Sequence, residues 1–384
     1  MRSSVIASAL VAAIVGFGGT IAIIVSAAVA VGATPSQIAS WVTCICLAMV
    51  AETAILSWRH RMPIVTAWST PGAALIAAST GFDIHAAVAA FIITAIALII
   101  TGLFSPLMRL VSRIPSSVSS GMLAGILASF VIGAAKAAGL DPLLILPLVA
   151  AFFLLRLWNP SLAVLGVLIG GIAYAWALGL SQPAPSFSIT WPEYIAPAFS
   201  LKSAIGLALP LYLVTMASQN LAGLAVLRAA DYHPPAGELI AVTGFFSFVS
   251  AFFGGSTTNL AAISAAICTG PDAHPDPRQR WLTGPFYALF YLILALGGGY
   301  FVALLAGLPK SLIALVAGLA LMPPLANALS ISLAKDNERI AAVATFATTA
   351  SGIAFFGVGA PFWGLVIGIS ILALDNYKKY GFKI

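Results

Sequence analysis

The chain has 384 residues, of which 61% are hydrophobic and only 7% are charged, and its mean hydropathy is +1.07. Soluble domains carry about 25% charged residues, so these few charges could not cover a water-soluble protein of this size. The net charge of +6 comes from a small number of cations placed at segment ends, which excludes a basic nucleic-acid-binding surface. The composition indicates an integral membrane protein.

Turn residues and charges divide almost the whole chain into apolar segments. The first apolar run continues to Val31 without a convincing cleavage site, which favours a transmembrane helix over a signal peptide. The sequence therefore predicts an all-α polytopic membrane protein with fourteen transmembrane segments. The predicted segments are 5–31, 37–57, 66–80, 85–104, 117–136, 142–157, 161–180, 203–228, 237–253, 256–270, 281–305, 310–328, 337–356 and 360–375.

Lysine and arginine residues gather at alternate ends of these segments, as expected if cytoplasmic loops collect them. The cations that follow even-numbered segments, or lie at the chain ends, are Arg2, Arg59, Arg61, Arg109, Arg113, Arg156, Arg228, Arg278, Arg280, Lys335, Arg339, Lys378, Lys379 and Lys383. The opposite loops hold only Lys136, Lys202 and Lys310. We therefore expect a multi-pass protein of the bacterial inner membrane with both termini in the cytoplasm.

The long connection 181–200 divides the chain into two halves of seven segments. Because seven is odd, the second half enters the membrane in the opposite orientation, which predicts two inverted repeats. The third segment of each half is too short for a full crossing and begins with polar, Gly- or Pro-containing sequence. We expect segments 3 and 10 to be half-helices that start inside the membrane.

The N-terminal ends of two such half-helices predict a binding site for a carboxylate or similar anion. Their first N–H groups lack partners and the helix dipole is positive there, while hydroxyls and an amide add donors without a fixed charge. The alternative is ordinary helix packing, for which membrane helices use the same small and hydroxyl residues. The candidate residues are Ser69, Thr70, Pro71, Ser256, Thr257, Thr258 and Asn259.

Polar residues in three further segments are candidates for the same site. Gln219 and Asn220 are adjacent amides in segment 8 that either contact the solute or bond neighbouring helices. Gly19 and Thr20 permit either a helix break or close packing in segment 1. Glu52 is the one carboxylate clearly within an apolar segment, and it is either a proton carrier or a structural residue bonded to a neighbouring helix.

Signatures of enzymes and cofactors are missing from the sequence. It has no phosphate-binding loop, which argues against ATP-driven pumping, and no His/Cys cluster with metal-ligand spacing, so no cofactor and no metal are expected. Cys44, Cys46 and Cys268 lie within apolar runs and are interpreted as buried packing residues.

Three stretches together resemble the bacterial benzoate:proton symporter family (BenE type): GFGGTIAIIVSAAVAVGATPSQIASWV, WSTPGAALI and GGSTTNLAAISAAI. The resemblance covers almost the entire chain. It implies an architecture similar to that of nucleobase:cation symporters with a seven-plus-seven inverted repeat. It also implies a core domain (1–110 and 200–306) that moves against a gate domain (111–181 and 307–384), and a homodimer formed through the gate domains.

The resemblance implies that the substrate is benzoate or a related aromatic carboxylate, imported with a proton. Nucleobase permeases of this fold place a glutamate in segments 8 and 10, where this chain has Gln219-Asn220 and Thr258-Asn259. Uncharged residues there suit an anionic substrate, and Glu52 is then the candidate proton-coupling residue. Two alternatives stay open: an inorganic anion exchanger or channel on the same scaffold, and a membrane-embedded enzyme or assembly subunit.

Overall fold

The computed structural model describes residues 3–104, 106, 114–183, 185–187, 189–355 and 358–381, and most of them are helical. Each predicted apolar segment coincides with one or more helices, and in segments 3 and 10 a short strand precedes the helix. The predicted cytoplasmic cations Arg2, Arg109, Arg113 and Lys383 lie outside the described residues.

The first four predicted segments form five helices and one strand. The helix of segment 1 breaks at Gly19 and Thr20, and a capping box starts the next long helix, where Thr34 and Gln37 each accept a hydrogen bond from the other's backbone N–H. Asp83 caps the helix of segment 4 by accepting from the Ala86 N–H at 2.8 Å. These elements are α1 (Ser3–Gly18), α2 (Ile21–Ala30), α3 (Pro35–His60), β1 (Thr66–Trp68), α4 (Thr70–Ala78) and α5 (Ile84–Leu103).

Segments 5 to 7 are three helices, and segment 8 is a helix of mixed type. The hydrogen-bond pattern of segment 8 widens twice to that of a π-helix, a rare form that is often found at functional sites. The helices of segments 5 to 7 are α7 (Ser116–Leu140), α8 (Pro142–Trp158) and α9 (Pro160–Ala177). Segment 8 comprises α10 (Leu201–Ser203), η1 (Ala204–Ala208), α11 (Leu209–Val214), η2 (Thr215–Asn220) and α12 (Leu221–Ala229).

Segments 9 and 11 are helical, and segment 10 between them repeats the strand-then-helix arrangement of segment 3. The two helices of segment 11 meet at Gly297 with a bend of 57°. The elements are α13 (Ala236–Ala251), β2 (Thr258–Leu260), α14 (Ile263–Thr269), the 3₁₀ helix η3 (Pro277–Leu282), α15 (Thr283–Leu296) and α16 (Gly298–Ala306).

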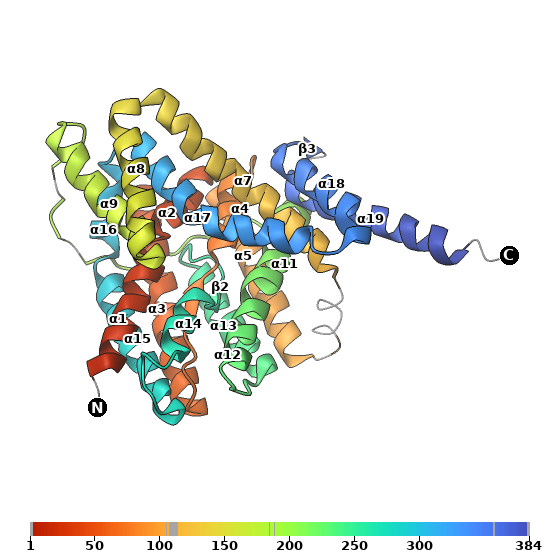
Figure 1. Ribbon diagram of the computed structural model, residues 1–384, viewed down its shortest axis with the longest axis horizontal. Helices are drawn as coiled ribbons and strands as arrows, with labels where there is room; N and C mark the ends of the chain where they lie inside the picture. The colour runs from red at the N-terminus through yellow and green to blue at the C-terminus, as the bar shows by residue number, and fades with distance from the viewer. Residues whose placement is uncertain are drawn as a thin grey trace.

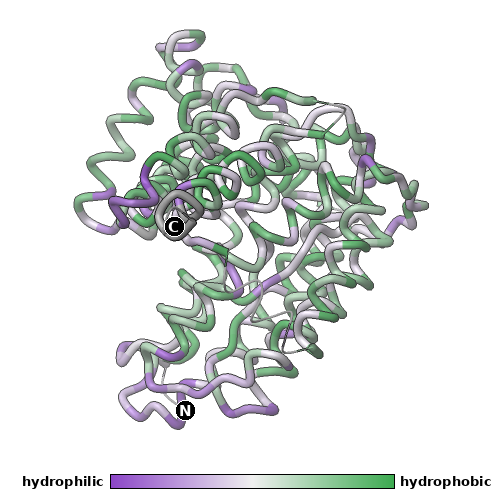
Figure 2. The backbone as a smooth tube through the Cα atoms, turned by 90° about the vertical axis from the view of Figure 1, so that its right-hand side faces the viewer, coloured by the Kyte–Doolittle hydropathy of each residue, from purple (hydrophilic) through white to green (hydrophobic). Residues whose placement is uncertain are grey.

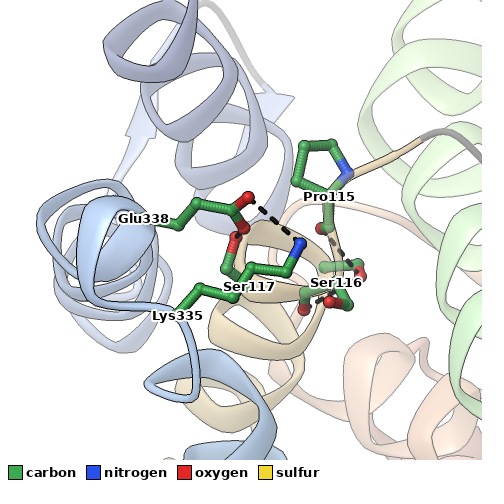
Figure 3. A network of polar contacts seen from close by, with 6 residues as sticks. Pro115, Ser116, Ser117, Lys335 and Glu338 are labelled. Atoms are coloured by element: carbon green, nitrogen blue, oxygen red, sulfur yellow. Dashed lines mark hydrogen bonds and ion pairs between the residues drawn. The ribbon is translucent and has the colours of Figure 1, made fainter. Parts of the chain in front are cut away.

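Segments 12 to 14 close the chain with three helices. They are α17 (Lys310–Ser332), α18 (Arg339–Ala350) and α19 (Ala360–Gly381), with the 3₁₀ helix η4 (Asp336–Glu338) and the strands β3 (Ala354–Phe355) and β4 (Val358–Gly359) between them. Glu338 ties the loop before α18 to the start of α7, because it accepts a hydrogen bond from Ser117 Oγ and lies 3.2 Å from Lys335 Nζ (Figure 3). The Ser117 hydrogen bond and the Lys335 charge lower the pKa of Glu338, against the opposing effect of its partial burial.

Helices that are far apart in the sequence lie side by side in two groups (Figure 1). In one group, α3 packs against α15 and α13, and α5 packs against α13. In the other, α7 packs along α17 and α18, and α19 packs on α18. Glycines permit the closest approaches in the second group: a Cβ on Gly125 would lie 2.8 Å from the Phe346 carbonyl oxygen, and one on Gly318 would lie 2.7 Å from that of Phe130.

Within the described part of the chain, six helices are long and apolar enough to span a membrane, and the bent pair of segment 11 makes a seventh if it is one span. Figure 2 shows apolar backbone through the body of the molecule and polar residues gathered at loops, including those near the N-terminal end. The protein is therefore a predominantly helical, multi-pass membrane protein. The exact number of fourteen crossings and the orientation of the termini stay predictions.

Candidate functional site

Two three-residue strands join segments 3 and 10 at the centre of the candidate site. Strands β1 and β2 pair antiparallel, with Trp68 opposite Thr258 and Thr66 opposite Leu260. The ladder extends at both ends, because the Ser69 N–H donates to the Thr257 carbonyl and the Ala261 N–H donates to the Val65 carbonyl, each at 3.0 Å. Each extended segment thus satisfies backbone groups of the other in the buried interior of the protein.

One helix start was predicted correctly and the other was wrong. Ser69 caps α4, since its hydroxyl accepts from the Gly72 N–H at 3.1 Å. The candidates Thr70 and Pro71 form the first turn of that helix. In segment 10, however, Ser256 and Thr257 precede strand β2, Thr258 and Asn259 belong to it, and α14 begins only at Ile263. Pairing with β1 holds this stretch extended and delays the helix.

A buried hydroxyl cluster connects the two strands to the π-helical part of segment 8. Thr215 Oγ1 lies 3.1 Å from Ser69 Oγ and 3.1 Å from Thr257 Oγ1. All three side chains are fully buried. Thr215 was not among the sequence candidates, although it lies only five residues before Asn220 in the same polar stretch.

The two candidate asparagines contact strand β2 in different ways. Asn220 Oδ1 accepts from the Leu260 N–H at 3.0 Å, so segment 8 is bonded directly to the strand. Asn259 Nδ2 donates to the Leu260 carbonyl at 2.9 Å. Asn259 Oδ1 and Ser256 Oγ are buried and have no hydrogen-bond partner among the described residues. Buried polar atoms without a hydrogen-bond partner are rare in proteins, so these two atoms are candidates for contact with a bound solute.

Glu52 lies at the same strand, in contact with one of the other candidates. Its Oε1 accepts from Thr258 Oγ1 at 2.5 Å, while Oε2 has no partner among the described residues. The side chain is fully buried on helix α3. No cation pairs with it in the part of the chain that the structure describes, where the salt bridges involve Glu238, Glu338 and Asp336.

The Thr258 hydroxyl has more hydrogen-bond acceptors around it than it has protons to donate. Besides Glu52, it lies 3.2 Å from the Thr243 carbonyl oxygen and 2.9 Å from Ser247 Oγ, which itself accepts from the Thr258 N–H. A hydroxyl carries a single donor proton. A proton on Glu52 would let the carboxyl group donate to Thr258 Oγ1 and leave Thr258 free to donate to Thr243. The arrangement therefore accommodates a neutral Glu52 while the Thr258 hydroxyl keeps its contacts with both Glu52 and Thr243.

A tryptophan of strand β1 is hydrogen-bonded to the helix break in segment 1. Trp68 Nε1 donates to Thr20 Oγ1 at 2.7 Å, and Gly19 and Thr20 separate helices α1 and α2. The Trp68 ring contacts Phe17, with centroids 5.5 Å apart, and Tyr291, with centroids 6.3 Å apart. An aromatic cluster thus lies beside strand β1. Tyr291 does not lie in a polar sequence motif, and the sequence analysis did not predict it as a site residue.

The structure brings most of the sequence candidates into one network around the strand pair. Ser69, Thr257, Thr258, Asn259 and Asn220 are fully buried in it, whereas the remaining candidates are covered to different degrees. Ser256 and Pro71 are buried, and Gly19, Thr20, Thr70 and Gln219 are partly exposed. The two prominent hollows lie elsewhere: one of about 260 Å³ is lined by Cys44, Pro192 and Phe246 among others, and one of about 610 Å³ by Trp58, Arg59 and Pro285 among others.

Solved structures with the same architecture define the class of protein to which this fold belongs. The chain aligns with SLC26A9 at a TM-score of 0.70 and 15% identity, over 97% of this chain and 66% of that one. It also aligns with the transmembrane domain of the cyanobacterial bicarbonate transporter BicA at a TM-score of 0.63 and 16% identity, over 96% of this chain and 97% of that one. The fold is therefore that of SLC26-like membrane transporters.

The family itself follows from sequence. The family model described as benzoate membrane transport protein matches residues 1–374, and the chain belongs to this family. It is 40% identical to the inner membrane protein YdcO of Escherichia coli, over 93% of this chain and 92% of that protein. It is 36% identical to the benzoate membrane transport protein of Acinetobacter baylyi, over 93% of this chain and 91% of that protein. The protein is a membrane transport protein of the inner membrane, not an enzyme, as the sequence predicts.

Proposed function

We propose that the protein imports benzoate or a related aromatic carboxylate by proton symport. Family membership supports a benzoate-like substrate. The proposal of proton coupling rests on the buried contact between Glu52 and Thr258. Thr258 lies on the strand that also holds Asn259, so the proposed proton carrier on α3 contacts the strand that holds candidate substrate ligands.

The chemistry of the network suits a carboxylate that must be released again. Hydroxyls, amides and the start of α4 offer hydrogen bonds without a fixed positive charge. The candidate ligands are Gly19, Thr20, Ser69, Thr70, Pro71, Gln219, Asn220, Ser256, Thr257, Thr258 and Asn259. Phe17, Trp68 and Tyr291 place aromatic faces beside them for the ring of the substrate.

Coupling follows from charge repulsion in a buried space. A substrate carboxylate and an ionised Glu52 would be two negative charges in a region of low dielectric, where repulsion is strong. Glu52 is therefore neutral when the anion binds, and one proton accompanies each anion. After release of the substrate, the empty site returns with Glu52 either ionised or neutral. Which of the two forms returns determines how tightly the proton flux is coupled to the substrate flux.

Alternating access is proposed to arise from movement between a core domain (1–110 and 200–306) and a gate domain (111–181 and 307–384). Some residues of these ranges lie outside the described part of the chain. The packing of α3 with α15 and of α7 with α17 supports two bodies of this kind. Full burial of Ser69, Thr258 and Asn259 supports a need for movement before a solute reaches them. We further propose a homodimer formed through the gate domains, with both termini in the cytoplasm.

An inorganic anion exchanger or channel is the competing function, and the shared fold with a bicarbonate transporter favours it. An anion such as bicarbonate or sulfate would need the hydrogen-bond donors but no aromatic contact. Competition separates the two possibilities: unlabelled benzoate inhibits uptake in the symporter, whereas inorganic anions inhibit it in the exchanger.

The test is the initial rate of radiolabelled benzoate uptake into proteoliposomes that contain only this protein. Initial rates are essential because benzoic acid leaks through lipid and reaches the same final distribution that proton symport would give. Empty liposomes measure that leak. We expect protein-dependent uptake that an inward proton gradient accelerates and that Thr258→Ala and Asn259→Ala abolish. Absence of protein-dependent uptake from folded protein would refute the benzoate assignment.

A further inference from the structure

A second hollow lies on the outer surface of the molecule, away from the strand pair. Its volume is about 610 Å³, and its walls are Ala54, Ile55 and Trp58 of α3, with Arg59 and with Pro285 of α15. Ile55 and Trp58 are 47% and 62% exposed. Because these helices cross the membrane, an exposed apolar wall of this kind contacts lipid chains and not water.

A cation stacked on two indoles lies beside this hollow, because one of the indoles belongs to Trp58 in its wall. The Arg61 guanidinium carbon lies 4.7 Å from the ring centroid of Trp58 and 4.2 Å from that of Trp281. Arg61 also has a φ of 51°, in the left-handed region that helix ends usually fill with glycine. The two ring contacts place the guanidinium beside Trp58, which is one wall of the hollow.

Among the described residues, no carboxylate forms an ion pair with Arg61, whereas its neighbour Arg59 has one. Arg59 Nε lies 2.7 Å from Glu238 Oε1, and His60 Nε2 lies 3.4 Å from the same oxygen. Among the described residues, no carboxylate or carbonyl oxygen bonds the guanidinium of Arg61. Stacking uses the faces of a guanidinium and leaves its N–H edge free for a second partner.

We propose that this hollow binds an anionic phospholipid. The lipid phosphate bonds the free edge of Arg61, and an acyl chain lies along Ile55 and Ala54 towards Pro285. The two features select the ligand together: a free phosphate would use only the cation, and a neutral lipid would use only the apolar wall. Tryptophan at the rim matches the preference of this residue for the membrane–water boundary.

The experiment measures lipid retention by native mass spectrometry. Intact protein is reconstituted in vesicles of phosphatidylethanolamine and phosphatidylglycerol, extracted in mild detergent, and the fraction carrying phosphatidylglycerol is recorded. We expect Arg61→Gln to lower the apparent affinity about five-fold, as expected for about 1 kcal/mol per cation at a membrane surface. Arg156→Gln removes an exposed cation at the end of α8 and serves as the matched control, with retention unchanged.

A second variant and a competitor make the result decisive. Trp281→Leu keeps the Arg61 charge but removes one of the stacked rings, and we expect it to reduce retention as well. Inorganic phosphate in excess should leave the lipid bound. Equal retention in Arg61→Gln, Arg156→Gln and the unchanged protein would overturn the proposal. Displacement of the lipid by inorganic phosphate would overturn it too, because the ligand would then be the phosphate alone.

Discussion

Replacement of Glu52 by glutamine tests the proposed coupling most directly. The amide has nearly the shape of the carboxyl group but cannot carry a proton, so substrate movement and proton movement should separate. An inward gradient of one pH unit provides about 1.4 kcal/mol per proton, equivalent to a ten-fold ratio. We expect the unchanged protein to show stimulation of uptake up to about ten-fold under this gradient. Glu52→Gln should show none beyond that of empty liposomes.

The fold should tolerate this change because the contacts around Thr258 can be kept. A glutamine Nε2 at the position of Oε1 can donate to Thr258 Oγ1, and Thr258 can then donate to the Thr243 carbonyl oxygen 3.2 Å away. The second Nε2 proton of the amide has no acceptor among the described residues, so we expect the free energy of unfolding to fall by about 1–3 kcal/mol. Thermal unfolding of the reconstituted variant therefore accompanies the transport assay, so that a loss of transport is compared at equal amounts of folded protein.

The assay compares two kinds of flux in the same proteoliposomes. Initial uptake with and without the gradient measures coupling, and exchange of internal unlabelled for external labelled benzoate measures movement of the loaded site. We expect Glu52→Gln to retain exchange. The control is Glu193→Gln, in the connection between the two halves. Among the described residues, Glu193 is bonded through its backbone alone, to Ser40. Gradient stimulation that survives in folded Glu52→Gln would refute the assignment of the proton to Glu52.

Three further predictions concern the stability of the fold. Gly125→Ala should destabilise the protein by about 1–3 kcal/mol in thermal unfolding through overpacking against α18, whereas Gly133→Ala, with open space around the new methyl group, should not. Asn220→Ala should cost about 1–3 kcal/mol by the same measurement, because it leaves a buried N–H of strand β2 unpaired. The lowered pKa of Glu338 contributes stability that is present above its unfolded value near 4.5 and is lost as the pH falls through the folded pKa. Unfolding measured from pH 6 to pH 3 should show this loss, and Ser117→Ala should reduce it.

The sequence was sufficient to locate the apolar segments and to select most of the candidate site. Hydrophobic runs bounded by charges and turns mark helices directly, and the helices fall where these runs lie. Ser69 was selected because it lies in the polar, Pro- and Gly-containing start of a short apolar segment, and in the structure it caps α4. Thr258 and Glu52 were each selected for polarity within an apolar environment, although nothing in the sequence indicated that they are bonded to each other.

Other features could not be read from one sequence, for physical reasons. Strands of three residues are too short to show a period, so the β1–β2 ladder was not predicted and α14 was placed too early. Thr215 was not predicted, because many threonines lie on these helices and the rotation of each helix about its axis determines which threonine contacts Ser69. The π-helical widening of η2 changes that rotation and has no sequence signal of its own.

The register of the strand pair connects Glu52 to the helix break of segment 1. Glu52 contacts Thr258, Thr258 is opposite Trp68 in the ladder, and Trp68 donates to Thr20 in the break between α1 and α2. These contacts lie in series across both halves of the chain, because antiparallel pairing places a residue of each half on either side of the ladder. A change in the protonation of Glu52 alters which oxygen accepts the hydrogen bond from the Thr258 hydroxyl. Thr258 in turn lies on the strand that is paired with the strand of Trp68. In the proton symport proposed above, this short path within the proposed core domain links Glu52 to the break in segment 1.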